Sequence, residues 1–488
     1  MKKVPIYLQI FIFISANNII VSLSKKYSHL TFKYFSLGLS LIILNFCFAI
    51  GNKSFNVMAP LHVMHYYNSE IEEERDWAKF RNQLTECKNM GVDGVSVDVW
   101  WGYVEKENNS FSWKYYDKIF LEIKSKGLKI IPILSFHAFE PKKKSNFSSP
   151  IPKWIWTLIN EESGIDISEL KYNSEDLDEF GKPYTSNEFI SHWANKWAMP
   201  QYAEFTKEFV SHFKSYLPLF HEINLSLGPS GELRYPSYNS HDDGKFPNRG
   251  RMQCYSKIAE NNFYNWSKTN NNEFDSLSFI KCQDFKMMLE SGNNVEDINL
   301  LNFFDWYNFS LLQHGRNMLK MALEIIPKNI SIGFKLPGIH WRIKDPKFPR
   351  IAELTCGLIN AYSKNGIKAY TNSLKTILHG LPTNRINFHF TCIEQKNPNS
   401  DAEFLKSYSV PEELTYDLSE AAKSLNLKIF GENSNSMNLK YDFSWEKMNA
   451  LVKNGSYFGV TILRIEDVTG ENLFAKKKFK KMIKAFKN

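Results

Sequence analysis

The chain has 488 residues, of which 43% are hydrophobic and 15% aromatic, which is enough apolar material for one large core or two small ones. Its net charge of +8 comes from 60 Lys and Arg against 52 Asp and Glu, and no stripe of basic residues interleaved with aromatic ones indicates a nucleic-acid partner. The six cysteines form no C-x-x-C pair, which argues against a zinc ribbon, a thioredoxin-like centre or a disulfide scaffold and favours buried free thiols.

Two apolar runs, at residues 5–15 and 36–50, set the first part of the chain apart. Neither is a clean apolar stretch of about twenty residues, so a membrane-spanning helix is marginal. The second run contains Cys47-Phe48-Ala49, a small-residue pattern that fits a signal-peptide cleavage site. A signal peptide, a signal anchor and a non-native upstream extension all fit residues 1–51. The segment predicts secretory targeting or membrane anchoring, with a cytoplasmic protein as the alternative, and membrane contact is expected only through it.

From residue 52 the chain repeats one pattern, a short β-branched or aromatic run followed by a helix-like stretch. Residues 70–90, for example, carry Trp77, Phe80, Leu84 and Cys87 at helical spacing. The predicted strands are residues 57–64, 94–101, 129–137, 222–228, 331–338, 386–392, 428–433 and 458–465. Eight strands that alternate with helices predict an α/β fold, a (β/α)8 TIM barrel over residues 52–488 as a single domain, with long loops after strands three and four.

The last residues of the chain combine an apolar spacing with a run of lysines. Ala475, Phe479, Met482 and Phe486 recur at helical spacing, and residues 476–481 supply part of the positive charge. This pattern predicts an amphipathic helix whose basic face is solvated.

Polar residues stand where the predicted strands end, and the chemistry of such a barrel takes place at that face. They are Asp98, His137, Glu232, Lys335, His340, Thr391, Glu394, Glu432, Asn433 and Arg464. A single Asp or His at a strand end can be structural, but a whole set of such strand ends is hard to explain by packing. We therefore expect these side chains to converge on one rim.

Two of the carboxylates suit the cleavage of an acetal, which needs a proton for the leaving oxygen and stabilisation of an oxocarbenium-like centre. We expect Glu232, between Gly231 and Leu233, to be the general acid, because an apolar surrounding would raise its pKa. Glu432, beside Asn433, is the expected general base. Predicted strands four and seven lie across the barrel mouth, which leaves room for an attacking water. Inversion would need a carboxyl separation of about 6.5–9.5 Å, and retention about 5–5.5 Å.

No metal or nucleotide pattern competes with this interpretation. Residues 62–65 read His-Val-Met-His, but the sequence contains neither H-E-x-x-H nor a glycine-rich phosphate loop. His62 fits a structural histidine as well as it fits a ligand. We expect no metal and no cofactor.

The segment after predicted strand four is diagnostic. Residues 228–238, GPSGELRYPSY, resemble the signature of the β-amylase family, in which the glutamate is the general acid. Further similar motifs follow in the family's order: VDVWWG at 97–102, SFH at 135–137, GIHW at 338–341, FTC at 390–392, GEN at 431–433 and LR at 463–464. The resemblance covers residues 55 to 485. It implies a (β/α)8 barrel that acts on an α-1,4-glucan such as starch, amylopectin or maltodextrin, and releases β-maltose from non-reducing ends with inversion.

The same resemblance implies roles for the other strand-end residues. Asp98 and His137 resemble the contacts to the terminal glucose, and Lys335, His340 and Trp341 those to the next sugars. Thr391 resembles the mobile inner-loop residue that stabilises the base after cleavage. Asn433 and Arg464 resemble neighbours of the base, Glu432, and are expected to bind substrate as well.

The chain departs from the family after His137. The family reads H-x-C-G-G-N-V-G-D there, a glycine-rich flap that brings an aspartate to the terminal sugar, whereas residues 137–145 read HAFEPKKKS. Ser145 falls where the aspartate should be, and Glu140 is a candidate substitute. Glycines permit the backbone excursions of a closing flap, so the present version is stiffer and more positive. After Asn433, Ser434-Asn435 replaces the family's small apolar pair.

Three functions remain open from the sequence. The first is an active hydrolase, which the presence of Glu232 and Glu432 favours. The second is a degenerate barrel that binds glucan or regulates another enzyme, which the altered flap favours. The third is a retaining glycosidase in which Glu394 pairs with Glu232. The oligomeric state is not predicted.

Overall fold

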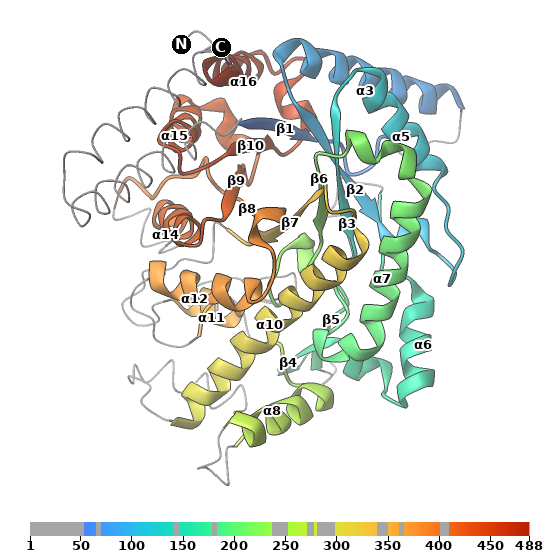
Figure 1. Cartoon of the computed structure of the whole chain (residues 1–488), viewed down its shortest axis with the longest axis vertical. Coiled ribbons are helices and arrows are strands. Elements are labelled where there is room, and N and C mark those ends of the chain that lie inside the picture. Colours follow the sequence, from blue (N-terminus) through green and yellow to red (C-terminus); the bar gives the residue numbers. More distant parts are fainter. Residues whose placement is uncertain are drawn as a thin grey trace, which may run out of the picture.

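Eight parallel strands form a closed barrel at the centre of the protein (Figure 1). The computed structural model describes residues 53–64, 70–140, 147–177, 183–236, 252–270, 278–280, 298–338, 350–360, 366–400 and 409–487. The barrel strands are β1 Ser54–Met58, β2 Gly94–Trp100, β3 Lys129–Ser135, β6 Glu222–Leu225, β7 Ser331–Leu336, β8 Ile386–Phe390, β9 Lys428–Glu432 and β10 Gly459–Ile462. They follow one another around the barrel, and β1 closes it by pairing with both β10 and β2. The predicted (β/α)8 TIM barrel is confirmed.

Helices surround the barrel, as Figure 1 shows. Along the chain they are α3 Glu70–Met90, α4 Trp101–Val104, α5 Lys114–Ser125, α6 Lys153–Ser163, α7 Asn195–His212, α8 Lys257–Asn270, α10 Ile298–Ile325, α11 Ile351–Thr355, α12 Gly366–Leu378, α14 Pro411–Ser424, α15 Asp442–Lys453 and α16 Leu473–Lys487. Helix α3 matches the predicted helix at 70–90, and its Trp77 and Leu84 are fully buried. The apolar spacing read from the sequence is therefore the face that packs on the barrel.

The long connections predicted after strands three and four are also present. Between β3 and β6 the chain forms α6, the antiparallel pair β4 Tyr172–Leu177 and β5 Pro183–Ser186, and α7. Between β6 and β7 it forms α8 and α10. Three-residue turns of 3-10 helix occur at both insertions, and the one at Pro229–Gly231 directly precedes Glu232.

Alternation along the strands, seen most clearly in β2, separates an apolar outer layer from an inner layer that carries the polar side chains of the pocket. In β2, Val95, Val97 and Val99 are buried in the apolar core, whereas Ser96 and Asp98 face the pocket inside the barrel. Successive side chains of a strand point to opposite faces, so one run of residues can serve both layers. The polar members of these strands are thus placed inside the barrel by the same pattern that builds the core.

Helix α16 packs against the first strand of the barrel. Phe55 of β1 lies with its ring centroid 5.7 Å from that of Phe486 and 6.4 Å from that of Phe479. Ala475, Phe479 and Met482 are buried. The amphipathic helix predicted at the end of the chain is present, and its apolar face packs against β1, one of the two strands whose pairing closes the barrel.

Two further expectations concern the N-terminal segment and the cysteines. Of the helices in the described ranges, none has the length and apolar character that crossing a membrane requires. Residues 1–51 lie outside those ranges, so the division of the chain at residue 51 stays a prediction. The described cysteines Cys87, Cys254, Cys356 and Cys392 are buried, as expected.

Gly459 provides a test of the closing seam. It pairs with Ser54, and a Cβ at this position would lie 2.1 Å from the Ser54 carbonyl oxygen. We expect Gly459→Ala to lower the free energy of unfolding by about 2–3 kcal/mol, because the two strands would have to move apart. Urea denaturation followed by circular dichroism measures this change.

Gly455, in the loop before β10, is the matched control. Its φ of +82° disfavours other residues, but a Cβ there would meet nothing within 4 Å. Gly455→Ala should therefore cost about 1 kcal/mol, from backbone strain alone. Equal losses for the two variants would show that contact at the seam is not the cause.

Candidate active site

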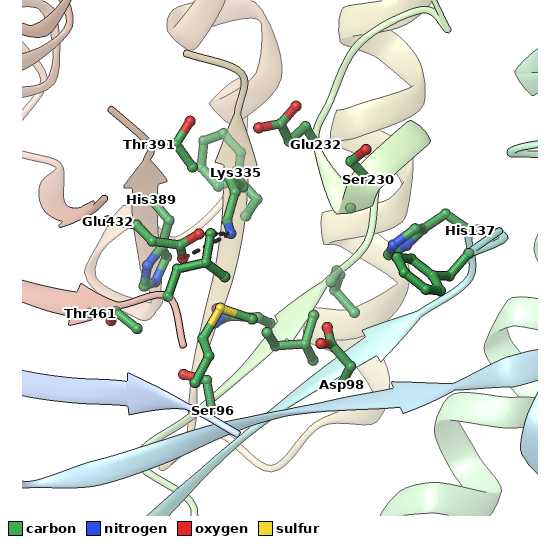
Figure 2. Close-up of a pocket in the computed structure, with 18 of the residues that line it drawn as sticks. Ser96, Asp98, His137, Ser230, Glu232, Lys335, His389, Thr391, Glu432 and Thr461 are labelled. Carbon is green, nitrogen blue, oxygen red and sulfur yellow. Dashed lines mark hydrogen bonds and ion pairs between the residues drawn. The ribbon is translucent and has the colours of Figure 1, made fainter. Parts of the chain in front are cut away.

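A pocket of about 410 Å³ opens at the ends of the barrel strands (Figure 2). The predicted site residues that border it are Asp98, His137, Glu232, Lys335, Thr391, Glu432 and Arg464. Further polar or aromatic residues around it are Ser96, Trp100, Phe139, Asn224, Ser230, Arg234, Phe334, His389, Ser434 and Thr461. The structure therefore brings together side chains from segments that are far apart in the sequence.

Glu432 is held by a lysine from a different strand. It is the last residue of β9, and the Lys335 amino group of β7 donates hydrogen bonds of 3.0 and 2.9 Å to its two carboxylate oxygens. Figure 2 shows this pair inside the pocket. Two charge-assisted bonds to one carboxylate fix its orientation.

Glu232 follows a tight turn after β6. Ser230 and Gly231 both have positive φ, 57° and 80°, and this turn brings the carboxyl group back over the barrel mouth. Arg234 donates from Nε to Oε2 of Glu232 at 3.1 Å. Burial raises the pKa of Glu232 above its ordinary value, although Arg234 and Lys335 oppose the change. Oε2 of Glu232 thus accepts a hydrogen bond from Arg234, whereas Oε1 does not.

Lys335 interacts electrostatically with all three carboxylates of the site. Burial lowers its pKa, but attraction to Glu432, Glu232 and Asp98 outweighs burial, and the net result is a raised pKa. The lysine is therefore a cation that feels all three carboxylates. Among the described residues, Lys335 is the cation that forms an ion pair with Glu432.

Asp98 of β2 borders the pocket and forms an ion pair with Arg464. The guanidinium Nη1 lies 3.4 Å from Oδ2 of Asp98 and donates to the carbonyl of Ala59 at 3.2 Å. Burial raises the pKa of Asp98, and Arg464 and then Lys335 oppose this. The backbone NH of Arg464 donates to Asp467 at 2.9 Å, which fixes the start of the next turn.

Asn433 lies behind the pocket rather than in its wall. It is fully buried, and its Oδ1 accepts from the backbone NH of Leu463 at 2.8 Å while its amide donates to the carbonyl of Asn435. Substrate contact by Asn433 stays a prediction. In this structure its side chain connects the end of β9 to the end of β10.

His137 is a neutral, buried member of the site. Its Nδ1 lies 2.8 Å from the Ser226 hydroxyl. Burial lowers its pKa to about 3, with Lys335 and Arg234 adding to the effect. At neutral pH the imidazole can both donate and accept a hydrogen bond, which suits contact with sugar hydroxyls.

Glu394 does not border the pocket although it stands near a strand end. It is fully buried and accepts hydrogen bonds from the backbone NH of Ser434 at 3.0 Å and from its hydroxyl at 2.7 Å. Gln395 also donates to it. The carboxylate therefore braces the turn that follows Glu432.

Thr391 borders the pocket and is tightly confined. A Cβ on Gly338 would lie 2.7 Å from its hydroxyl, so the glycine allows the two segments to approach. His340 and Trp341 lie outside the described residues, as do Lys142 to Ser145 of the altered stretch. Glu140 is described; it is exposed and is not among the residues that border the pocket.

The sequence did not predict that His389 and Ser96 border the pocket. His389 borders it, and its Nε2 lies 2.7 Å from a carboxylate oxygen of Glu222. Burial alone would raise the pKa of Glu222, but attraction to His389 and a hydrogen bond from Asn387 lower it to about 2. The available signal was alternation, because Ser96 and His389 stand two residues before Asp98 and Thr391 and so share their face.

His62 belongs to an aromatic stack and not to a ligand cluster. Its ring centroid lies 4.2 Å from that of Tyr115 and 5.0 Å from that of Phe147. Within the described part of the chain, no group of three or more His, Cys, Asp or Glu side chains is arranged to hold a metal ion. The structural interpretation of His62 accounts for its position.

Comparison with known proteins identifies the family. The model of glycosyl hydrolase family 14 matches residues 56–487. The chain belongs to this family. The predicted resemblance to the β-amylase family is confirmed, and so is the prediction that the protein is a glycoside hydrolase.

Several characterised members are similar over most of the chain. A thermophilic beta-amylase from Thermoanaerobacterium thermosulfurigenes is 29% identical over 89% of this chain and 76% of its own length. A beta-amylase from Bacillus cereus is 27% identical over 87% and 74%. The crystal structure of the catalytic domain of beta-amylase from Paenibacillus polymyxa superposes with a TM-score of 0.71 and 26% identity, covering 89% of this chain and 99% of that one.

The Glu222–His389 pair predicts how stability depends on pH. A depressed pKa means that the folded state favours the carboxylate, so the stabilisation is complete above the ordinary value near 4.5 and is lost as pH falls toward 2. We expect Glu222→Gln to lower the free energy of unfolding at pH 7, on the order of 3 kcal/mol, and to remove much of the decline between about pH 4.5 and 2. Urea unfolding of wild type and variant across this range measures both effects. Parallel curves would contradict the pair's role.

Proposed function

We propose that this family 14 protein is an exo-acting, inverting hydrolase of α-1,4-glucans that releases β-maltose from non-reducing ends. The observation that carries the proposal is the placement of Glu232 and Glu432 in one pocket, each with its own cationic partner. The names of the family members to which the chain is similar support the substrate class. Residues 52–488 are the proposed catalytic domain.

Glu232 is the proposed general acid. Burial raises its pKa, which favours the protonated form that must donate to the leaving glucosyl oxygen. Because Arg234 donates to Oε2, the proton belongs on Oε1. The departing sugar takes that proton as the bond between the anomeric carbon and the bridging oxygen breaks.

Glu432 is the proposed general base. The two hydrogen bonds from Lys335 hold its carboxylate in one orientation, from which it can take a proton from a water that attacks the anomeric carbon on the other face of the sugar. Asp98, with Arg464, and the neutral His137 are proposed to bind hydroxyls of the terminal glucose. Thr391 and Lys335 border the same cavity and are proposed contacts to the neighbouring sugar.

A glucan-binding protein without turnover is the second candidate, and the altered stretch after His137 is the observation that favours it. The placement of both carboxylates argues for turnover. A retaining mechanism through Glu394 has little support, because that side chain is fully buried and is bonded to Ser434.

The deciding experiment incubates the full chain with maltopentaose and follows the products by chromatography and the anomeric form by NMR. Maltose that appears first as the β-anomer supports the proposal. We expect Glu232→Gln and Glu432→Gln each to reduce kcat by at least about a thousandfold, since each removes one of the two proton transfers. Binding of maltotetraose should change little in both variants.

Glu394→Gln is the matched control among the carboxylates of this region. It should reduce kcat far less than the other two variants, because the side chain acts only through the turn after Glu432. Complete loss of turnover in Glu394→Gln, with a glycosyl adduct trapped on Glu394 in the wild type, would favour the retaining mechanism. No product, together with measurable glucan binding, would favour the non-catalytic candidate.

The pH profile gives an independent test of the acid. Arg234 lowers the pKa of Glu232, so Arg234→Met should raise that pKa further. An enzyme that needs protonated Glu232 loses activity as pH rises through this pKa, and the alkaline limb of kcat/KM should therefore move to higher pH. Arg234→Lys, which keeps the charge, should leave the limb closer to the wild-type position. A shift to lower pH in the Met variant would count against Glu232 as the acid.

A further inference from the structure

Phe139 borders the pocket two residues after His137, at the start of the altered stretch. Its ring is partly buried, so one part packs on the protein and another faces the cavity. Trp100, His137 and Ala138 also line the pocket, and the rings of Trp100 and His137 lie with centroids 5.1 Å apart. Phe139 thus extends an aromatic surface that begins at the proposed terminal-sugar contacts.

The backbone of Phe139 is anchored on both sides. Its NH donates to the carbonyl of Ser149 at 2.8 Å, and the NH of Ser149 donates back to the carbonyl of Phe139 at 2.9 Å. The preceding residue, Ala138, donates to the carbonyl of Glu188 at 2.7 Å. Three backbone hydrogen bonds over two successive residues leave this position little freedom.

The ring of Phe139 is held as well. It lies with its centroid 5.8 Å from that of Trp100 and is stacked at 6.1 Å on Phe147. Phe147 is 4% exposed and packs also on His62 and Tyr103. The anchored position therefore belongs to an aromatic cluster that continues into the core.

We propose that Phe139 is a substrate-positioning residue, a pre-formed aromatic wall on which the terminal glucose packs. This rests on the proposed function and deepens it. The axial C–H face of a glucose ring is apolar, whereas its rim carries hydroxyls, so an aromatic face beside polar groups suits it. Here Asp98 and His137 supply the polar groups, and Phe139 supplies the apolar surface.

The second part of the inference is that the wall is ordered without substrate, because its backbone hydrogen bonds and ring contacts all come from the protein itself. Side chains that are already ordered lose no conformational freedom on binding. Phe139 would then compensate in part for the aspartate that the sequence lacks at Ser145. The contact is dispersive and apolar instead of a hydrogen bond, so it orients the sugar face and not an individual hydroxyl.

Binding measured without turnover tests this. Maltotetraose is titrated calorimetrically into Glu232→Gln, alone and combined with Phe139→Leu, Phe139→Tyr or Phe147→Leu. We expect Phe139→Leu to weaken binding about tenfold, because it keeps apolar volume and loses the flat face. Phe139→Tyr should bind within about twofold of the parent. Melting temperatures are recorded for all variants.

Phe147→Leu is the matched control, since Phe147 is in the same cluster and does not border the pocket. It should lower the melting temperature yet weaken binding by less than about threefold. Equal loss of binding for Phe139→Leu and Phe147→Leu, or no loss for Phe139→Leu, would overturn the proposal, because Phe139 would then act only through packing or not at all.

Amide hydrogen exchange tests pre-formation and needs no variant. The amides of Phe139 and Ser149 should exchange slowly without glucan and gain little protection when maltotetraose is added. Fast exchange that slows only on binding would contradict a pre-formed wall.

The two proposals can fail separately. A wild-type protein that releases no maltose, with binding that still depends on the Phe139 ring, would reject the function and keep the wall. β-Maltose release with unchanged binding in Phe139→Leu would do the reverse.

Discussion

Three carboxylates share one buried pocket, and the loss of hydration of each must be compensated for the barrel to be stable. The structure meets this requirement with one cation for each acid: Arg464 for Asp98, Arg234 for Glu232 and Lys335 for Glu432. The compensation differs among them. Lys335 donates to both oxygens of its partner, whereas Arg234 donates to one oxygen and leaves Glu232 with a raised pKa.

Each of these pairs joins parts of the fold that are separate in sequence, except that of Glu232 and Arg234. Lys335 comes from β7 and Glu432 from β9, so their pairing depends on the barrel being closed with the observed register. Arg464 reaches Asp98 because β10 and β2 flank β1. The pairing of charges in the site is therefore a consequence of barrel closure. A change that shifts β10 relative to β1 would also move Arg464 relative to Asp98.

The sequence predicted the barrel because its signals are local. Strand periodicity, helical spacing such as that of Trp77 and Leu84, and polar residues at strand ends can all be read in short windows. Tertiary contacts could not be read this way. Asn433, for example, stands beside Glu432 in the sequence, but no local signal shows that its side chain accepts a hydrogen bond from Leu463, directly after β10. The loss of glycines after His137 was visible, whereas the pairing of Phe139 with Ser149 was not.

The Glu222–His389 pair is a second tertiary contact that could not be predicted from short stretches of sequence. Glu222 and His389 lie within strands, where a polar residue has no obvious partner until the barrel is closed. Alternation places His389 on the same face as Thr391, but it does not say how deep the cavity reaches. Depth depends on the size of the inward side chains of all the strands together, for example the glycine at 333, where a Cβ would collide with Asn224.

The departure from the family and the retained carboxylates are compatible because they reside on different elements. Glu432 and Lys335 are parts of strands, and the turn that carries Glu232 follows β6. The altered stretch follows β3, and its described part contacts the pocket through Phe139. Under the proposed function, a change there would alter how the terminal sugar is held, while both carboxylates belong to other elements. Binding surfaces that are already ordered spare the free energy of ordering, about 0.5–1.5 kcal/mol for each immobilised side chain. The proposed anchored wall and a glycine-rich flap would therefore be two physical solutions to the same positioning requirement.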